Sequence, residues 1–92
     1  MGDKAPGGVM PVSVSVIGMG KLGAPMAAAI AARGIRTIGV DTDAAKVEAI
    51  AEGLPPVFEP GLAETLILAK GRLTATQNIE EAVRDSNITF IV

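Results

Sequence analysis

The chain lacks several residue types on which protein chemistry often depends. Its 92 residues include no cysteine and no histidine, and its only aromatic residues are two phenylalanines. The absence of cysteine excludes disulfides and thiolate metal sites, and the absence of histidine removes the commonest general base and the commonest metal ligand. We therefore expect neither a metal site nor a catalytic residue within this sequence.

The chain also lacks the features that direct proteins to nucleic acids or membranes. Its formal net charge is −2, it has no basic stripe, and it has almost no aromatic side chains to stack on bases. No apolar run approaches the roughly 20 residues of a membrane-spanning helix. Residues 1–11 contain three glycines and two prolines without the hydrophobic centre of a secretory signal, which predicts a flexible leader. These observations predict a cytoplasmic protein with neither nucleic-acid nor membrane partners.

The hydrophobic periodicity of residues 12–92 predicts strands that alternate with helices. Short runs rich in β-branched residues predict strands at 12–17, 35–40, 73–76 and 88–92. Alanine- and leucine-rich runs with helical spacing predict helices at 21–33, 44–52, 60–70 and 79–84. This alternation implies an α/β fold, a Rossmann-like parallel sheet with helices on both faces. Right-handed crossovers then predict the strand order 3-2-1-4.

Individual residues predict where the helices begin and end. Asp43 suits the N-cap of the second helix, and Asn78 with Glu81 resembles a capping box at the start of the last. Pro60 suits the first position of the third helix, where the missing N–H costs nothing. Gly34 is typical of the position just beyond a helix C-terminus.

A glycine-rich turn joins the first strand to the first helix, with the sequence Gly-Met-Gly-Lys-Leu-Gly at 18–23. Gly18 permits a tight turn, Gly20 leaves no side chain between backbone and phosphate, and Gly23 allows the helix to pack on the strand. The free N–H groups and the positive end of the helix dipole then face a bound pyrophosphate. Because eleven residues of the chain are glycine, a plain tight turn remains an alternative for this motif taken alone.

An acidic residue, Asp41, closes the second predicted strand. A carboxylate there can accept hydrogen bonds from both hydroxyls of an adenosine ribose and repels a 2′-phosphate, so it favours NAD over NADP. Helix capping is the alternative role for Asp41, although Asp43 is better placed for it. The residues predicted to bind the cofactor are Gly18, Met19, Gly20, Lys21, Leu22, Gly23, Asp41 and Lys46.

For several residues a structural role competes with a functional one. Lys21 and Lys46 are placed to add positive charge near the cofactor, but a solvent-facing lysine is the competing interpretation for each. Glu59 in Glu-Pro-Gly suits a helix start better than a catalytic acid. The methionines are interpreted as core residues: Met10, Met19 and Met26.

Taken together, the motifs resemble the N-terminal domain of the UDP-glucose/GDP-mannose dehydrogenases, the nucleotide-sugar 6-dehydrogenases. That family has Gly-x-Gly-Tyr-Val-Gly-x-Pro after its first strand, matched here at 18–25, and a second strand that ends in Val-Asp, matched by Asp41. Lys46 matches a basic residue of the family, and Lys21-Leu22 departs from its Tyr-Val. The blocks Glu-Pro-Gly-Leu at 59–62 and Gly-Arg-Leu at 71–73 are more specific than the glycine motif.

The resemblance implies that residues 12–92 are the N-terminal part of an NAD-binding domain in a longer enzyme. Such an enzyme oxidises the C6 alcohol of a nucleotide sugar to a uronate with two NAD⁺. The resemblance also implies that the catalytic residues and most of the sugar site lie outside this sequence. A homo-oligomer is expected for the full-length enzyme.

Two other functions remain open at this point. The run from Gly18 to Met26 also fits the cofactor domain of a β-hydroxyacid dehydrogenase, although the blocks at 59–62 and 71–76 argue against it. A non-catalytic NAD-sensing module is compatible with the lack of histidine and cysteine.

Overall fold

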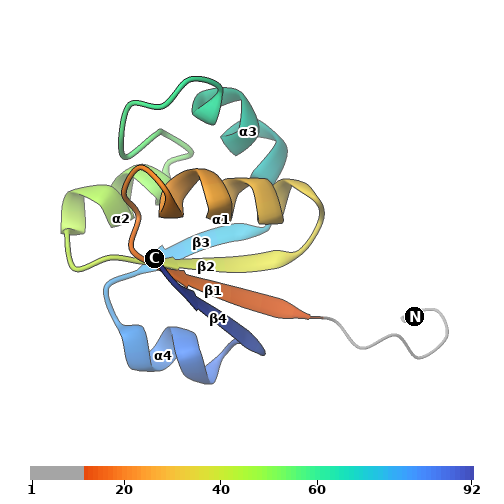
Figure 1. The fold of residues 1–92 in the computed structure, drawn as a ribbon, viewed down its shortest axis with the longest axis vertical. Coiled ribbons are helices and arrows are strands. Elements are labelled where there is room, and N and C mark those ends of the chain that lie inside the picture. Colours follow the sequence, from red (N-terminus) through yellow and green to blue (C-terminus); the bar gives the residue numbers. More distant parts are fainter. Residues whose placement is uncertain (1–11) are drawn as a thin grey trace, which may run out of the picture.

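The computed structural model describes residues 12–92, which form a four-stranded sheet flanked by four helices (Figure 1). The leader predicted over residues 1–11, with Met10 in it, lies outside the described residues. The elements in chain order are β1 (Ser13–Ile17), α1 (Gly23–Ala32), β2 (Arg36–Val40), α2 (Ala44–Ala51), α3 (Leu62–Ala69), β3 (Leu73–Thr76), α4 (Ile79–Arg84) and β4 (Ile88–Ile91).

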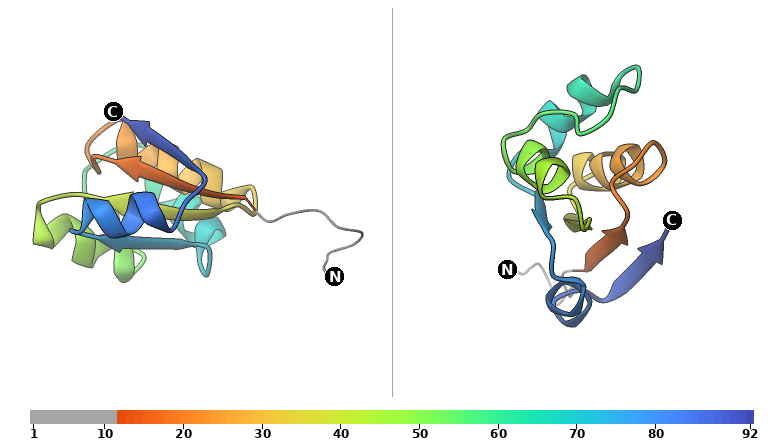
Figure 2. Two further views of the ribbon diagram at one scale, coloured as in Figure 1. Left: turned by 90° about the horizontal axis from the view of Figure 1, so that it is seen from below. Right: turned by 90° about the vertical axis from the view of Figure 1, so that its left-hand side faces the viewer.

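The sheet is parallel throughout, with the strand order β3-β2-β1-β4. This order confirms the prediction, and the fold is Rossmann-like. Helices α1, α2 and α3 lie over one face and α4 over the other, which is visible from two directions (Figures 1 and 2). Because all strands are parallel, their carboxyl ends meet at one edge of the sheet.

The two faces of β1 differ in chemistry, because successive side chains point to opposite sides of a strand. Val14 and Val16 belong to the apolar core, which also contains alanines of α1 and residues from α2 and α3. The alanines allow α1 to lie close to the sheet. On the other face, Ser15 is fully buried and its hydroxyl group lies 2.8 Å from that of Thr89 in β4. Ser86, just after α4, donates from its hydroxyl to Ser15 at 2.9 Å, so the buried hydroxyl is satisfied.

The helix caps largely follow the sequence predictions. Asp43 accepts a hydrogen bond from the N–H of Ala45 at 2.9 Å, and Asn78 accepts one from Glu81 at 3.0 Å, so both N-caps are confirmed. The reciprocal half of the predicted capping box does not form. Thr76 lies between the two partners: its hydroxyl accepts the N–H of Asn78 and donates to the carboxylate of Glu81.

The start of α3 corrects the sequence prediction, which placed Pro60 in the first helical position. The helix begins at Leu62, because Gly61 has a φ of +83°. That left-handed conformation lies outside a right-handed helix and is accessible to glycine without strain. Leu62, Leu66 and Ala69 form the buried stripe of α3.

Arg72 ties two helix ends together at the edge of the sheet where the strands begin. Its Nε donates to the carbonyl oxygen of Ala31 in α1 at 2.9 Å, and its Nη2 donates to that of Leu68 in α3 at 3.0 Å. A cation at a helix C-terminus satisfies carbonyls that lack a partner within the helix and interacts favourably with the helix dipole. The arginine of the Gly-Arg-Leu block therefore has a structural role here.

β4 forms one edge of the sheet, where Ile91 is largely exposed and Ile88 and Phe90 are partly exposed. None of the helices in residues 12–92 has the length and apolar character needed to cross a bilayer.

Candidate functional site

The glycine turn lies at the carboxyl edge of the sheet, between β1 and α1 (Figure 1). Gly18 has a φ of +106°, a value that favours glycine strongly over other residues. Its N–H donates to the carbonyl oxygen of Val40 at 2.7 Å, so the start of the turn is fixed to the end of β2.

The next part of the turn presents backbone N–H groups that the protein itself does not use. The first helical hydrogen bond of α1 runs from the N–H of Ala24 to the carbonyl oxygen of Gly20 at 3.0 Å. Within residues 12–92 the N–H groups of Gly20, Lys21 and Leu22 have no hydrogen-bond acceptor. These donors stand at the positive end of the helix dipole, an arrangement that binds anions.

Glycine occupies positions 20 and 23 of the motif for different physical reasons. A Cβ at Gly23 would lie 1.6 Å from the carbonyl oxygen of Gly18 and 2.9 Å from a side-chain carbon of Val92, so no larger residue fits there. A Cβ at Gly20 would meet nothing within 4 Å. The protein's own packing does not require glycine at position 20. The open space beside it instead fits a ligand that approaches the backbone closely.

Asp41 follows β2 directly, and its carboxylate faces the glycine turn. Oδ2 accepts the N–H of Met19 at 2.8 Å, and Oδ1 accepts the N–H of Asp43 at 2.9 Å. Each oxygen of a carboxylate can accept about two hydrogen bonds, so both retain the capacity to accept another from a sugar hydroxyl. Asp43 caps α2, so the capping role considered for Asp41 belongs to its neighbour.

Opposing influences act on the pKa of the Asp41 carboxyl. Partial burial acts to raise it. The hydrogen bonds from Asp43 and Met19, together with the positive charge of Lys46, outweigh burial and hold the pKa below its ordinary value of 3.8. The group is therefore a carboxylate at neutral pH, with the negative charge that repels a 2′-phosphate.

The structure brings the eight predicted residues to one edge of the sheet, but it gives them different roles. Met19 has no free N–H to offer a ligand, because Asp41 accepts it, and its side chain is fully buried as a core residue. Lys21 and Leu22 have exposed side chains, and Lys46 is half-buried. The sequence predictions missed Gly39, which packs against Met19. Its position inside a predicted strand was the available signal, because glycine there often marks a close approach.

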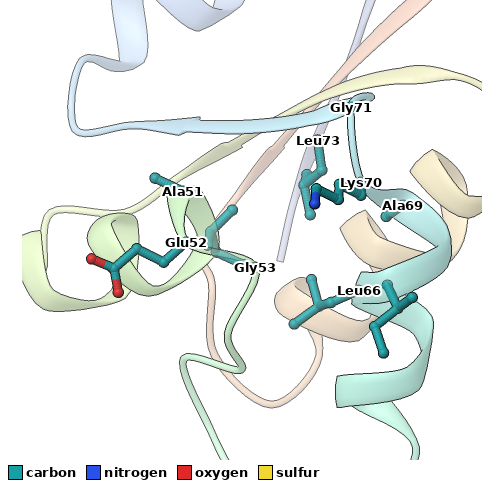
Figure 3. A pocket seen from close by; sticks show the side chains of 10 residues that line it. Ala51, Glu52, Gly53, Leu66, Ala69, Lys70, Gly71 and Leu73 are labelled. Atoms are coloured by element: carbon teal, nitrogen blue, oxygen red, sulfur yellow. The ribbon is translucent and has the colours of Figure 1, made fainter.

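A cavity of about 330 Å³ lies elsewhere, where the C-terminal ends of α2 and α3 meet the beginning of β3 (Figure 3). Its walls are mostly apolar, with Leu66 and Leu73 from two of these elements and Gly53 and Gly71 at their ends. None of the predicted cofactor residues lines it. No group of three or more acidic, histidine or cysteine residues within 12–92 is arranged to hold a metal ion.

Comparison with known proteins connects this geometry to a family. Residues 12–92 match the model of the UDP-glucose/GDP-mannose dehydrogenase family, NAD binding domain. The chain is 40% identical over 80 residues to GDP-mannose 6-dehydrogenase of Pseudomonas aeruginosa, covering 85% of this chain and 18% of that protein. It is 34% identical over 82 residues to UDP-glucose 6-dehydrogenase of Rhizobium meliloti, covering 87% and 19%.

Solved structures agree with the sequence comparison. A UDP-glucose dehydrogenase from Pyrobaculum islandicum superposes with a TM-score of 0.83 at 39% identity, over 95% of this chain and 21% of that one. A ternary complex of GDP-mannose dehydrogenase from Pseudomonas aeruginosa gives a TM-score of 0.82 at 40% identity, over 86% and 19%. The chain thus spans about a fifth of the length of these relatives. It belongs to the UDP-glucose/GDP-mannose dehydrogenase family and carries the NAD-binding domain of that family.

Proposed function

We propose that this chain holds the adenosine and pyrophosphate parts of NAD for an enzyme that oxidises the C6 alcohol of a nucleotide sugar to a uronate. The observation that carries the proposal is the pairing of unused N–H groups at 20–22 with the Asp41 carboxylate, next to a glycine that packing does not require. A dinucleotide has an anionic diphosphate next to a ribose with two hydroxyls, which is the complement of this arrangement.

Each part of the site has one task in this proposal. The N–H groups of Gly20, Lys21 and Leu22 donate to the diphosphate, and the absence of a side chain at Gly20 allows the approach. The two oxygens of Asp41 accept from the ribose hydroxyls while they keep their bonds to the backbone. Lys46, whose positive charge lowers the pKa of Asp41, favours the carboxylate form of that residue.

The proposed reaction of the whole enzyme has two oxidation steps. Conversion of a CH₂OH group to a carboxylate consumes one water and two NAD⁺ and releases two NADH and three protons. The nicotinamide of the bound cofactor accepts the hydride in each step. The relatives of known structure or sequence bear the names of UDP-glucose and GDP-mannose dehydrogenases, which supports this reaction class and leaves the sugar open. We expect the enzyme that carries this domain to form two NADH for each uronate. A measured ratio of one NADH per uronate would contradict the proposed reaction.

Titration of NAD into the 92-residue chain tests the binding role of Asp41 directly. We expect Asp41→Ala to weaken NAD binding about tenfold or more, because hydrogen bonds to a charged acceptor contribute roughly 1.5–3 kcal/mol each. Chemical-shift titration by NMR is suitable because it measures affinities into the millimolar range. The wild-type chain should also bind NADP more weakly than NAD, and Asp41→Ala should reduce that preference.

Asp85→Ala is the matched control, since it removes an exposed aspartate just after α4, on the other face of the sheet. It should bind NAD as the wild type does. Equal affinity of the wild type and Asp41→Ala would remove Asp41 from the site. Failure of the wild-type chain to bind NAD at millimolar concentrations would contradict the proposed binding role as a whole.

A cytoplasmic location and a homo-oligomeric full-length enzyme stay predictions from the sequence. The assignment to the family favours this function over a β-hydroxyacid dehydrogenase.

A further inference from the structure

Gly39, in the interior of β2, is a glycine whose backbone conformation does not require glycine. It is not among the glycines with positive φ, and it pairs in regular parallel register with Val16 of β1. Its neighbour provides the reason for the missing side chain. A Cβ at Gly39 would lie 2.6 Å from Sδ of Met19, 3.3 Å from its Cε and 3.4 Å from its Cγ.

Met19 is the second residue of the glycine turn, and its side chain is completely buried. A methionine side chain can normally rotate away from an obstacle at low cost. This one has no exposed surface toward which to move, and a close-packed interior has few voids. An added methyl group at position 39 must displace the side chain of Met19, and we expect that shift to reach the backbone of residue 19 because the side chain is fully buried.

Three consecutive residues, the last two of β2 and the one after it, hold the beginning of the turn. Gly39 accommodates the side chain of Met19, Val40 accepts the N–H of Gly18 at 2.7 Å, and Asp41 accepts the N–H of Met19 at 2.8 Å. Asp41 comes two residues after Gly39, directly beyond the end of β2. The side chain and the N–H of Met19 are thus held by residues that lie close together in the chain, at the end of one strand and just after it.

We propose that Met19 and Gly39 are positioning residues, which set the place of the turn so that the N–H groups of residues 20–22 meet the diphosphate. This inference rests on the proposed NAD-binding function. Neither residue touches the ligand: Met19 is buried, and Gly39 lies beneath it. The fit of the Met19 side chain over Gly39 determines where the next three N–H groups lie. Asp41 binds both the N–H of Met19 and, in the proposed complex, the ribose hydroxyls.

A double-mutant cycle on the 92-residue chain tests this proposal, with Gly39→Ala, Met19→Ala and the combined variant. Gly39→Ala should weaken NAD binding about tenfold, which corresponds to the loss of one hydrogen bond to a charged group. In the Met19→Ala background the same change should alter NAD affinity less than about twofold, because the atoms that it contacts are gone. Met26→Ala is the control: it truncates a partly buried methionine of α1 and should leave NAD affinity unchanged.

A second measurement keeps the test independent of NAD. Hydrogen exchange of the Met19 amide reports its bond to Asp41, and Gly39→Ala should speed that exchange when residue 19 is methionine but not when it is alanine. The inference is overturned if Gly39→Ala has the same effect on affinity and exchange in both backgrounds, or no effect in either. If the wild-type chain fails to bind NAD while the exchange data show the coupling, the proposed function fails and the positioning of the turn by Gly39 stands.

Discussion

The two ends of α1, which lie at opposite edges of the sheet, differ in how their backbone hydrogen bonds are satisfied. At the carboxyl edge, the N-terminus of α1 follows three N–H groups that have no acceptor within residues 12–92. At the amino edge, Arg72 donates to Ala31 near the C-terminus of α1 and to Leu68 near that of α3. At one end three N–H groups remain unused within residues 12–92, and at the other the carbonyl groups are satisfied from within the protein.

The glycines at the two edges differ in the same way. At the carboxyl edge, Gly18 and Gly23 meet at a distance that no Cβ can enter. At the amino edge, Gly34 and Gly71 also have positive φ values, but a Cβ at either would meet nothing within 4 Å. Glycines at the amino edge serve only the backbone conformation. Gly18 and Gly23 of the turn are in close contact with other atoms, so substitutions at the two edges should have separable effects on stability and on binding.

The largest expected effect is that of Gly23→Ala. The new methyl group collides with the carbonyl oxygen of Gly18, which is backbone and has little freedom to move. We expect a loss of about 3 kcal/mol or more in the free energy of unfolding, together with the loss of NAD binding. Urea denaturation and NAD titration measure the two effects.

Gly34→Ala is the matched control for this substitution at the opposite edge. It adds the same atom where there is space, at a φ of +96°. The left-handed conformation should cost about 1–2 kcal/mol of stability and leave NAD affinity unchanged. A change in NAD affinity equal to that caused by Gly23→Ala would contradict the separation of the two edges.

Arg72→Ala should have an intermediate effect, confined to stability. It removes two hydrogen bonds from a cation to helix carbonyls, one of them partly buried, which predicts a loss of about 1–2 kcal/mol in the free energy of unfolding. NAD affinity should stay within about twofold of wild type, because Arg72 lies at the other edge.

Arg84→Ala provides the comparison, since Arg84 is another arginine near a helix C-terminus, in the last turn of α4, but its side chain is 71% exposed. Surface charges of this kind contribute about 0–1 kcal/mol, so the variant should be nearly as stable as wild type. Equal destabilisation by the two arginine variants would show that the bonds to α1 and α3 contribute little.

The smallest expected effect is a pH dependence that originates at Asp41. Its pKa is lower in the folded chain than the ordinary value of 3.8, so folding favours the carboxylate form. That contribution to stability is fully present above the ordinary value and is lost as the pH falls through the folded pKa. The difference in unfolding free energy between wild type and Asp41→Asn should therefore be constant from about pH 5 upward and become smaller below pH 4. A difference in unfolding free energy that grows as the pH falls would contradict a lowered pKa for Asp41 in the folded chain.

Local signals in the sequence were enough for most of the fold. The β-branched runs, the alanine-rich helix and the glycines at helix ends act through backbone conformation and periodicity, which are properties of a few neighbouring residues. The strand order followed from the handedness of crossovers. The errors fall where a neighbour intervenes: Thr76 takes the place of a partner in the predicted capping box, and the left-handed Gly61 delays the start of α3.

The candidate site was predictable only in part. The sequence placed Gly18, Gly20, Gly23 and Asp41 at one edge, because the carboxyl ends of parallel strands meet there. It did not indicate that Asp41 accepts the N–H of Met19, since those residues are 22 positions apart and their contact depends on how β1 and β2 align.

The sequence by itself determined the order of strands and helices, the glycines of the turn and the acid at the end of β2, because each depends on short-range conformational preferences. Only the tertiary structure decided which N–H groups remain unused, that Gly39 accommodates Met19, and that Arg72 closes the far ends of two helices. Hydrogen bonds and steric contacts between distant segments depend on atomic positions to within a few tenths of an ångström. Those positions are fixed only when the strands have paired and the helices have packed on them.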